Sequence, residues 1–136
     1  MRRALLAAAA LAAAVAVTAT AAPNPPRIAG CIPGTASTVR PSKIIVACGD
    51  ANFYFTNLRW SSWNAKQAVA HGLAQLNDCK PNCAAGHFHT YRSTVTLSRA
   101  RSCSDGTRAF TRMAWQFQGT VPSGMKPRGS QSLPCR

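Results

Sequence analysis

The sequence of 136 residues predicts a mainly all-β protein. We expect a small antiparallel sandwich or barrel-like sheet that is stapled by disulfides and preceded by an N-terminal signal helix. Short runs of alternating or β-branched apolar residues recur between turns that contain Gly, Asp and Ser, which favours strands. Six cysteines in so short a chain favour a disulfide framework. An alanine-rich apolar N-terminus favours export, which supplies the oxidising compartment that such a framework needs.

Residues 1–21 predict a secretory signal peptide. The basic pair Arg2-Arg3 precedes an apolar run, and Ala19-Thr20-Ala21 has the small-x-small form of a cleavage site. No later segment approaches the roughly 20 apolar residues that span a bilayer. We therefore expect a secreted, extracellular protein with no membrane span in the mature chain. An uncleaved anchor is the alternative, although alanine favours membrane insertion less than leucine does.

Residues 22–41 are rich in Pro, Gly, Ser and Thr and predict an irregular lead-in to a single secreted β-domain, residues 42–136. The apolar run from Lys43 to Cys48 predicts a buried strand that ends at a Gly-Asp turn. The next segment, Asn52 to Trp60, reads NFYFTNLRW. Under strict alternation it carries aromatic residues on both faces, so we expect it to be central in the sheet.

The segment from Ala65 to Leu76 has apolar residues at helical spacing, but His71-Gly72 interrupts a helix and the neighbouring segments are strands. We therefore favour a strand there. From His87 to Ser98, alternation assigns one set of residues to the core face: His89, Tyr91, Ser93, Val95 and Leu97.

The last strand is expected from Arg108 to Gln118, followed by a loop-like C-terminal tail that Cys135 closes. Its inward residues are Ala109, Thr111, Met113, Trp115 and Phe117, with Arg108, Arg112 and Gln116 outward. Phe110 is the exception to this alternation, because a large apolar side chain falls on the polar face.

All six cysteines are disulfide candidates: Cys31, Cys48, Cys79, Cys83, Cys103 and Cys135. Six cysteines allow 15 pairings, and the sequence does not choose among them. The turn Lys80-Pro81-Asn82 favours a local bridge between Cys79 and Cys83. For the other four we provisionally pair Cys31 with Cys135 and Cys48 with Cys103.

The stretch NDCKPNCAAGHFHTY contains two cysteines and two histidines, all residue types that bind zinc. Zinc sites of the Cys2His2 type separate their histidines by three to five residues, whereas Phe88 alone separates His87 from His89. Oxidised cysteines also do not coordinate a metal. We therefore expect no metal and no cofactor, and interpret the stretch as a disulfide staple at a strand entrance.

Charge is the strongest compositional signal. Without Arg2 and Arg3, 14 basic residues face three aspartates, giving a net charge of +11. The resulting positive potential attracts polyanions such as nucleic acid, anionic lipid headgroups or acidic cell-wall polymers. The basic residues are scattered along the chain, so keeping an exported protein dispersed is the alternative role.

Evidence for catalysis is weak. Glycoside hydrolysis generally needs two carboxylates, and each aspartate, Asp50, Asp78 and Asp105, has a turn-like sequence context that explains it. No Gly-x-Ser-x-Gly elbow, phosphate loop or HExxH is present. We expect His89 to be a buried, hydrogen-bonded structural residue, so no catalytic residue is assigned. The surface residues proposed to meet a ligand are Trp60, Trp63, His87, His89, Arg108 and Arg112, although core packing is the default for the two tryptophans.

Several motifs resemble a family of small secreted actinobacterial proteins with no established activity. They are Arg40-Pro41-Ser42, Ala47-Cys48-Gly49-Asp50, Leu58-x-Trp60-Ser61-Ser62-Trp63, Asn77-Asp78-Cys79-x-Pro81-x-Cys83-Ala84 and Gly86-x-Phe88-His89-x-Tyr91. The resemblance covers roughly Arg40 to Arg112. It implies kinship without a mechanism, and it leaves out Cys31 and Cys135.

We therefore expect a small secreted basic domain that binds or has a structural role and is not an enzyme. Its partner would be an anionic polymer, a component of the cell envelope or an extracellular protein. One alternative is a small secreted hydrolase that uses the neighbourhood of Asp50, Asp78 and His89. The other is a secreted protease inhibitor. The sequence does not determine the oligomeric state.

Overall fold

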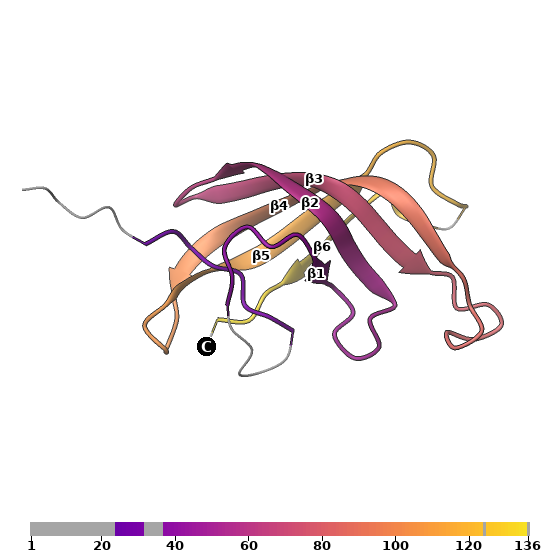
Figure 1. The fold of residues 1–136 in the computed structure, drawn as a ribbon, viewed down its shortest axis with the longest axis horizontal. Helices are drawn as coiled ribbons and strands as arrows, with labels where there is room; N and C mark the ends of the chain where they lie inside the picture. The colour runs from indigo at the N-terminus through magenta and orange to yellow at the C-terminus, as the bar shows by residue number, and fades with distance from the viewer. Residues whose placement is uncertain (1–23, 32–36, 124, 136) are drawn as a thin grey trace, which may run out of the picture.

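The computed structural model describes residues 24–31, 37–123 and 125–135, and these form one six-stranded antiparallel sheet. Strands adjacent in sequence are adjacent in space, in the order β1 to β6. Their bounds are Ile44–Ile45, Phe53–Trp63, Gln67–Asn77, Phe88–Ser102, Arg108–Phe117 and Arg128–Ser132. The sheet curls into a half-barrel (Figure 1), which confirms the all-β prediction. The expected signal peptide lies outside the described residues.

The concave side of the sheet holds the core, and its residues differ in size from strand to strand. On β3 the buried inward residues are small, namely Ala68, Ala70 and Ala74. The neighbouring strands contribute large ones, including Phe55 and Leu97, both fully buried. Small residues on one strand leave room for large ones from the others, which permits tight curvature around a filled interior.

A β-bulge explains the aromatic residues of β2. The pairing of β2 with β3 shifts between Thr56 and Arg59, and Asn57 has a φ of 53°. The extra residue reverses the alternation. As a result Phe55 before the bulge and Leu58 after it are both buried. The aromatic residues of this segment therefore do not require a strand that is buried on both faces. In the sheet, β2 is the second strand and lies next to the short edge strand β1.

The irregular lead-in bridges the open side of the half-barrel. The backbone of Arg27 pairs with the start of β5 through hydrogen bonds to Arg108 and Phe110, and Ile28 pairs with Thr38. The chain then reaches the other edge, where the Leu58 N–H donates to Ser42. Backbone hydrogen bonds thus connect β5 to β2 across the gap, and Figure 1 shows the lead-in beneath the sheet.

Two tryptophans of β2 anchor this lead-in. The Trp63 indole Nε1–H donates to the Pro26 carbonyl at 2.9 Å, and that of Trp60 donates to the Pro41 carbonyl at 2.8 Å. The two rings meet edge to face at 4.5 Å between centroids. Phe110, the residue that broke the alternation of β5, packs against Trp63 and is fully buried. Both tryptophans therefore have the packing role that the sequence suggested as the default.

Beyond these elements, the expected boundaries are partly wrong. The run from Lys43 to Cys48 is a strand only at Ile44–Ile45, because the chain turns at Val46. The ambiguous segment is indeed a strand, β3. The tail is not all loop, since β6 pairs with β5 there. In the described part of the chain, no helix is long and apolar enough to cross a membrane.

The disulfides join Cys31 to Cys48, Cys79 to Cys83, and Cys103 to Cys135. The local bridge was predicted correctly, whereas the provisional pairing of the other four cysteines is wrong. The lead-in returns beside β1, which brings Cys31 to the β1–β2 turn. Strand β6 runs back along β5, and this antiparallel return carries Cys135 to the β4–β5 turn that holds Cys103.

The first testable prediction concerns the lead-in. The bridge between Cys31 and Cys48 closes a loop of 17 residues, so replacing both cysteines with serine should lower the free energy of unfolding by about 3 kcal/mol. Denaturant-induced unfolding measures the change. The matched control is the double serine variant of Cys79 and Cys83, whose separation of 4 residues constrains the unfolded chain much less. Equal losses in the two variants would contradict a special role for the lead-in.

Candidate functional site

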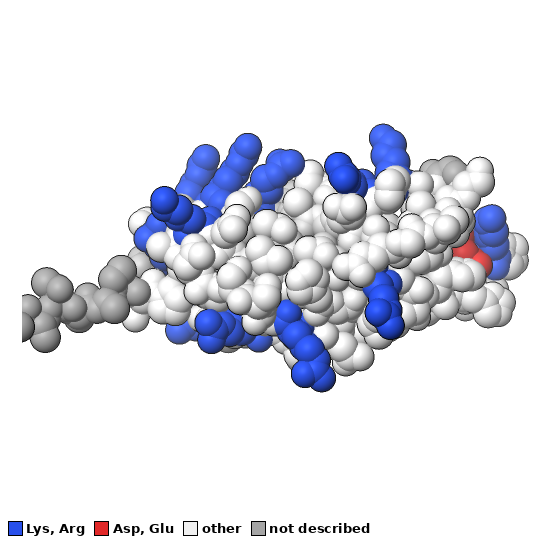
Figure 2. All heavy atoms as spheres, turned by 90° about the horizontal axis from the view of Figure 1, so that it is seen from above, with Lys and Arg blue, Asp and Glu red and all other residues white. Residues whose placement is uncertain are grey.

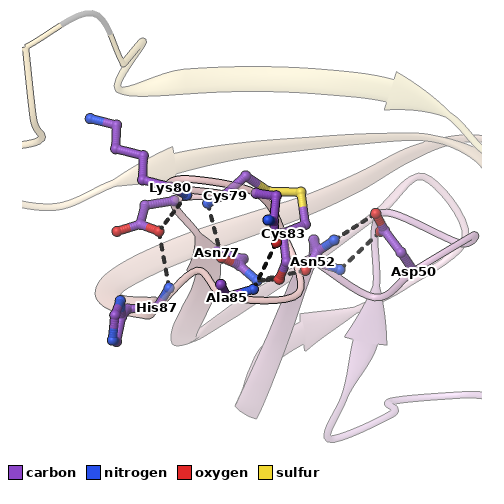
Figure 3. The surroundings of a disulfide bond; sticks show 10 residues. Asp50, Asn52, Asn77, Cys79, Lys80, Cys83, Ala85 and His87 are labelled. Carbon is purple, nitrogen blue, oxygen red and sulfur yellow. Dashed lines mark hydrogen bonds between the residues drawn. A yellow bond between two sulfur atoms is a disulfide. The ribbon is translucent and has the colours of Figure 1, made fainter.

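The loop between β3 and β4 is organised around the side chain of Asn77. Its amide Nδ2 donates to the Asn52 side chain and to the Cys83 carbonyl, both at 2.8 Å, while its Oδ1 accepts from the Cys79 N–H at 2.9 Å. Gly86 is required beside it, because a Cβ there would lie 2.1 Å from Asn77 Oδ1. Figure 3 shows these contacts around the disulfide. The motif residues in this loop therefore shape the backbone.

Asp78 completes this loop. Its Oδ1 accepts from the backbone N–H groups of Lys80 and His87 at 3.1 and 3.0 Å, and its Oδ2 contacts His89 Nε2 at 3.0 Å. The hydrogen bond from His89 and those from the two backbone amides hold the pKa of the Asp78 carboxyl well below its usual range. Asp78 is therefore ionised at neutral pH and acts only as an acceptor.

His89 is not the buried residue that alternation predicted. Its side chain is 50% exposed, because the inward face of β4 reaches the open end of the half-barrel at this point. The ionised Asp78 accepts a hydrogen bond from Nε2, so the neutral ring has its lone pair on Nδ1. The prediction that His89 is hydrogen-bonded is confirmed, and the prediction that it is buried is wrong.

Asp78 and His89 line a cleft of about 520 Å³ with an apolar side formed by Leu76, Tyr91, Pro122 and Met125. Asp50 does not line this cleft. Its carboxylate accepts from the backbone and side-chain nitrogens of Asn52, which hold its pKa below the ordinary value. The structure thus brings together two of the three residues of the hydrolase alternative, and it gives Asp50 a turn-forming role.

The third aspartate is also engaged locally. Asp105 accepts from the backbone N–H and the hydroxyl of Thr107, which lower its pKa. In the described part of the chain, the only ion pair within 4.0 Å is that of Asp78 with His89. No described Lys or Arg side chain therefore pairs with any of the three aspartates. Figure 2 shows basic side chains along the molecule, with acidic atoms visible only near one end.

The two arginines proposed on the last strand belong to different surroundings. The Arg108 guanidinium donates to the Ala65 carbonyl in the β2–β3 turn at 3.3 Å. That of Arg112 donates to the Ser130 hydroxyl on β6 at 2.9 Å, on the convex side of the sheet. The irregularity at Arg99 (φ 56°) and the inward turn of Phe110 separate them. Sequence alternation alone does not reveal this separation.

The remaining candidates do not form a metal site. His87 is exposed in the loop, and the four potential zinc ligands include two cysteines that are joined to each other. Among residues 24–31, 37–123 and 125–135, no group of three His, Cys, Asp or Glu side chains is placed to hold a metal ion.

Comparison with known proteins found no family model, no curated protein and no solved structure that matches this chain. The resemblance to secreted actinobacterial proteins accordingly stays a prediction.

The second testable prediction follows from the lowered pKa of Asp78. A carboxyl with a depressed folded-state pKa stabilises the fold above its unfolded pKa, about 3.9, and this contribution is lost as the pH falls toward the folded value. Asp78→Asn should therefore lower the melting temperature at neutral pH, and its difference from the wild type should narrow below about pH 4.

Thermal unfolding followed across this pH range measures that difference. His89→Ala is the companion variant, because it removes the largest cause of the shift and keeps the two backbone donors. It should raise the pKa of Asp78 toward the ordinary value in an NMR titration. A difference between Asp78→Asn and wild type that does not change with pH would contradict the assignment.

Proposed function

We propose that the protein is a secreted cationic binding domain that associates with anionic polymers of the extracellular or cell-envelope environment. The observation that carries the proposal is that all three aspartates are engaged by turn residues or by His89, and none of them pairs with a described Lys or Arg side chain. Unpaired cations attract polyanions, and the release of condensed counterions favours the complex.

Secretion is the second part of this proposal. Three disulfides are consistent with an oxidising environment, since cytosolic thiols are kept reduced. The signal peptide expected at residues 1–21 would deliver the chain to that environment.

The hydrolase alternative receives limited support. Asp78 fixes His89 with Nδ1 as an acceptor at the edge of a cleft, which is an arrangement that a general base requires. A nucleophile within hydrogen-bonding distance of His89 would be needed for acyl transfer, and among the described residues Asp78 is its only side-chain partner. The inhibitor alternative rests on the exposed loop at Lys80, which the bridge between Cys79 and Cys83 braces.

The third testable prediction concerns the charge. Fluorescence anisotropy should show binding to heparin, teichoic acid and DNA, with the logarithm of the affinity falling linearly as the logarithm of the salt concentration rises. Uncharged dextran is the control polymer and should not bind. If no anionic polymer binds even at low salt, the charge serves solubility alone and the proposal fails.

A matched pair of variants tests which surface takes part. If the convex side binds the polymer, Arg112→Gln should reduce the slope of log affinity against log salt concentration by about one. Arg108→Gln removes the same charge and should reduce this slope less. Equal changes in the slope for the two variants would show that binding depends on the total charge and not on one face of the sheet.

A further inference from the structure

We infer that one row of side chains across the convex face of the sheet forms the binding site, and that its ligand is a polyhydroxylated chain bearing phosphate or sulfate esters. The row is Arg59, His71, Thr94, Gln116 and Arg128, one residue from each strand from β2 to β6. This inference rests on the proposed function and specifies where the polymer lies and what chemical class it belongs to.

The pairing register establishes the row. Arg59 is opposite His71, His71 opposite Thr94, Thr94 opposite Gln116, and Gln116 opposite Arg128. Directly opposite residues share a face of the sheet. The face is convex, because Ala70 on one side of His71 and Val95 beside Thr94 point into the buried core. With strands about 4.8 Å apart, the row spans roughly 19 Å from one arginine position to the other.

Hydrogen bonds between neighbours order the middle of this row. The Thr94 hydroxyl contacts His71 Nδ1 at 3.2 Å and accepts from the Gln118 amide at 3.2 Å. Because these side chains are already ordered, binding a ligand costs less conformational entropy. The row thus has arginines at both ends and the hydrogen-bonding side chains of His71, Thr94 and Gln116 between them.

An open groove of about 630 Å³ follows the β4–β6 half of the row. Polar residues line most of it: Thr94, Thr96, Arg112, Gln116, Arg128 and Ser130. Arg112 therefore supplies a third guanidinium beside the row, and no aspartate is among the lining residues. Guanidinium groups bind phosphate and sulfate oxygens, while hydroxyl and amide groups suit the hydroxyls of a sugar or polyol.

The same face is poorly suited to single-stranded nucleic acid, which binds by stacking its bases on aromatic side chains. Trp115 borders the groove, but its ring packs against Phe53 at 5.3 Å between centroids and against Phe55 in the interior. The exposed Phe88 on β4 is six residues from Thr94, roughly 20 Å along the strand. Aromatic platforms are therefore absent from the described residues of the row itself.

The fourth testable prediction uses heparin oligosaccharides of graded length as the sulfated probe and glycerol-phosphate teichoic acid as the phosphorylated one. Wild-type affinity should rise with oligosaccharide length until the chain spans the row, and level off beyond it. The double variant R59Q/R128Q should bind long oligosaccharides at least about tenfold more weakly at low salt and lose most of this length dependence.

The matched control is K66Q/K80Q, which removes the same charge from two loops outside the row. It should weaken binding to all lengths alike and keep the length dependence. If the two double variants behave identically while polymers still bind, the row is not the site, although the proposed function stands. If no polymer binds to the wild type, both proposals fail.

The chemical class is tested by competition against single-stranded DNA of matched charge. Displacement by heparin or teichoic acid at lower concentrations than DNA supports a polyhydroxylated ligand, and the stronger of the two competitors identifies sulfate or phosphate as the ester. Stronger displacement by DNA would overturn the class and point to the aromatic residues at the end of the sheet.

Discussion

The fold depends on the bridging of an incomplete barrel by a segment without regular secondary structure. A curled sheet with two open edges leaves both backbone groups and apolar side chains exposed along its gap. Here the lead-in pairs with β5 through Arg27 and meets β2 through Ser42, while Trp60 and Trp63 bind its carbonyls. The buried Ile28 then becomes part of the core. Because these contacts are made by loop backbone, the bridge between Cys31 and Cys48 limits how far the segment can move away.

The concave and convex sides of the sheet differ in what their side chains do. The concave side holds the core, and in the loop the side chains of Asn77, Asp78 and His89 have intramolecular hydrogen-bond partners. The convex side has Thr, Ser, Gln and Arg side chains, and the hydrogen bonds among them include those at Thr94 and Ser130 and that between Thr90 and Gln75. Residues that belong to the motifs, such as Asn77 and Asp78, therefore explain how the loop keeps its shape.

Alternation predicted the middle of β4 and the second half of β5, because inward residues such as Val95 and Met113 meet a continuous core. It misplaced Phe110 at the start of β5, where the irregularity at Arg99 changes the faces. It failed at Asn57, where a bulge reversed the faces, since one residue in the left-handed region leaves no periodic signal in the sequence. The segment of β3 remained ambiguous because alanine fits a helix as well as a strand, and only its neighbours made small residues necessary. The polar strand β6 had no apolar pattern at all. Without it, neither the partner of Cys103 nor the row on the convex face could be derived, since both depend on long-range register.

The small residues of β3 have a consequence for how such a protein diversifies. Ala68, Ala70 and Ala74 confine the packing requirements to one side of the strand, so the intervening outward positions experience little constraint from the interior. Substitutions at outward positions such as His71 or Thr94 are accordingly expected to change folding little. A chain that retains the inner alanines, the bulge and the three bridges can therefore vary its outer rows, which makes the sheet a scaffold whose outer surface can be redesigned.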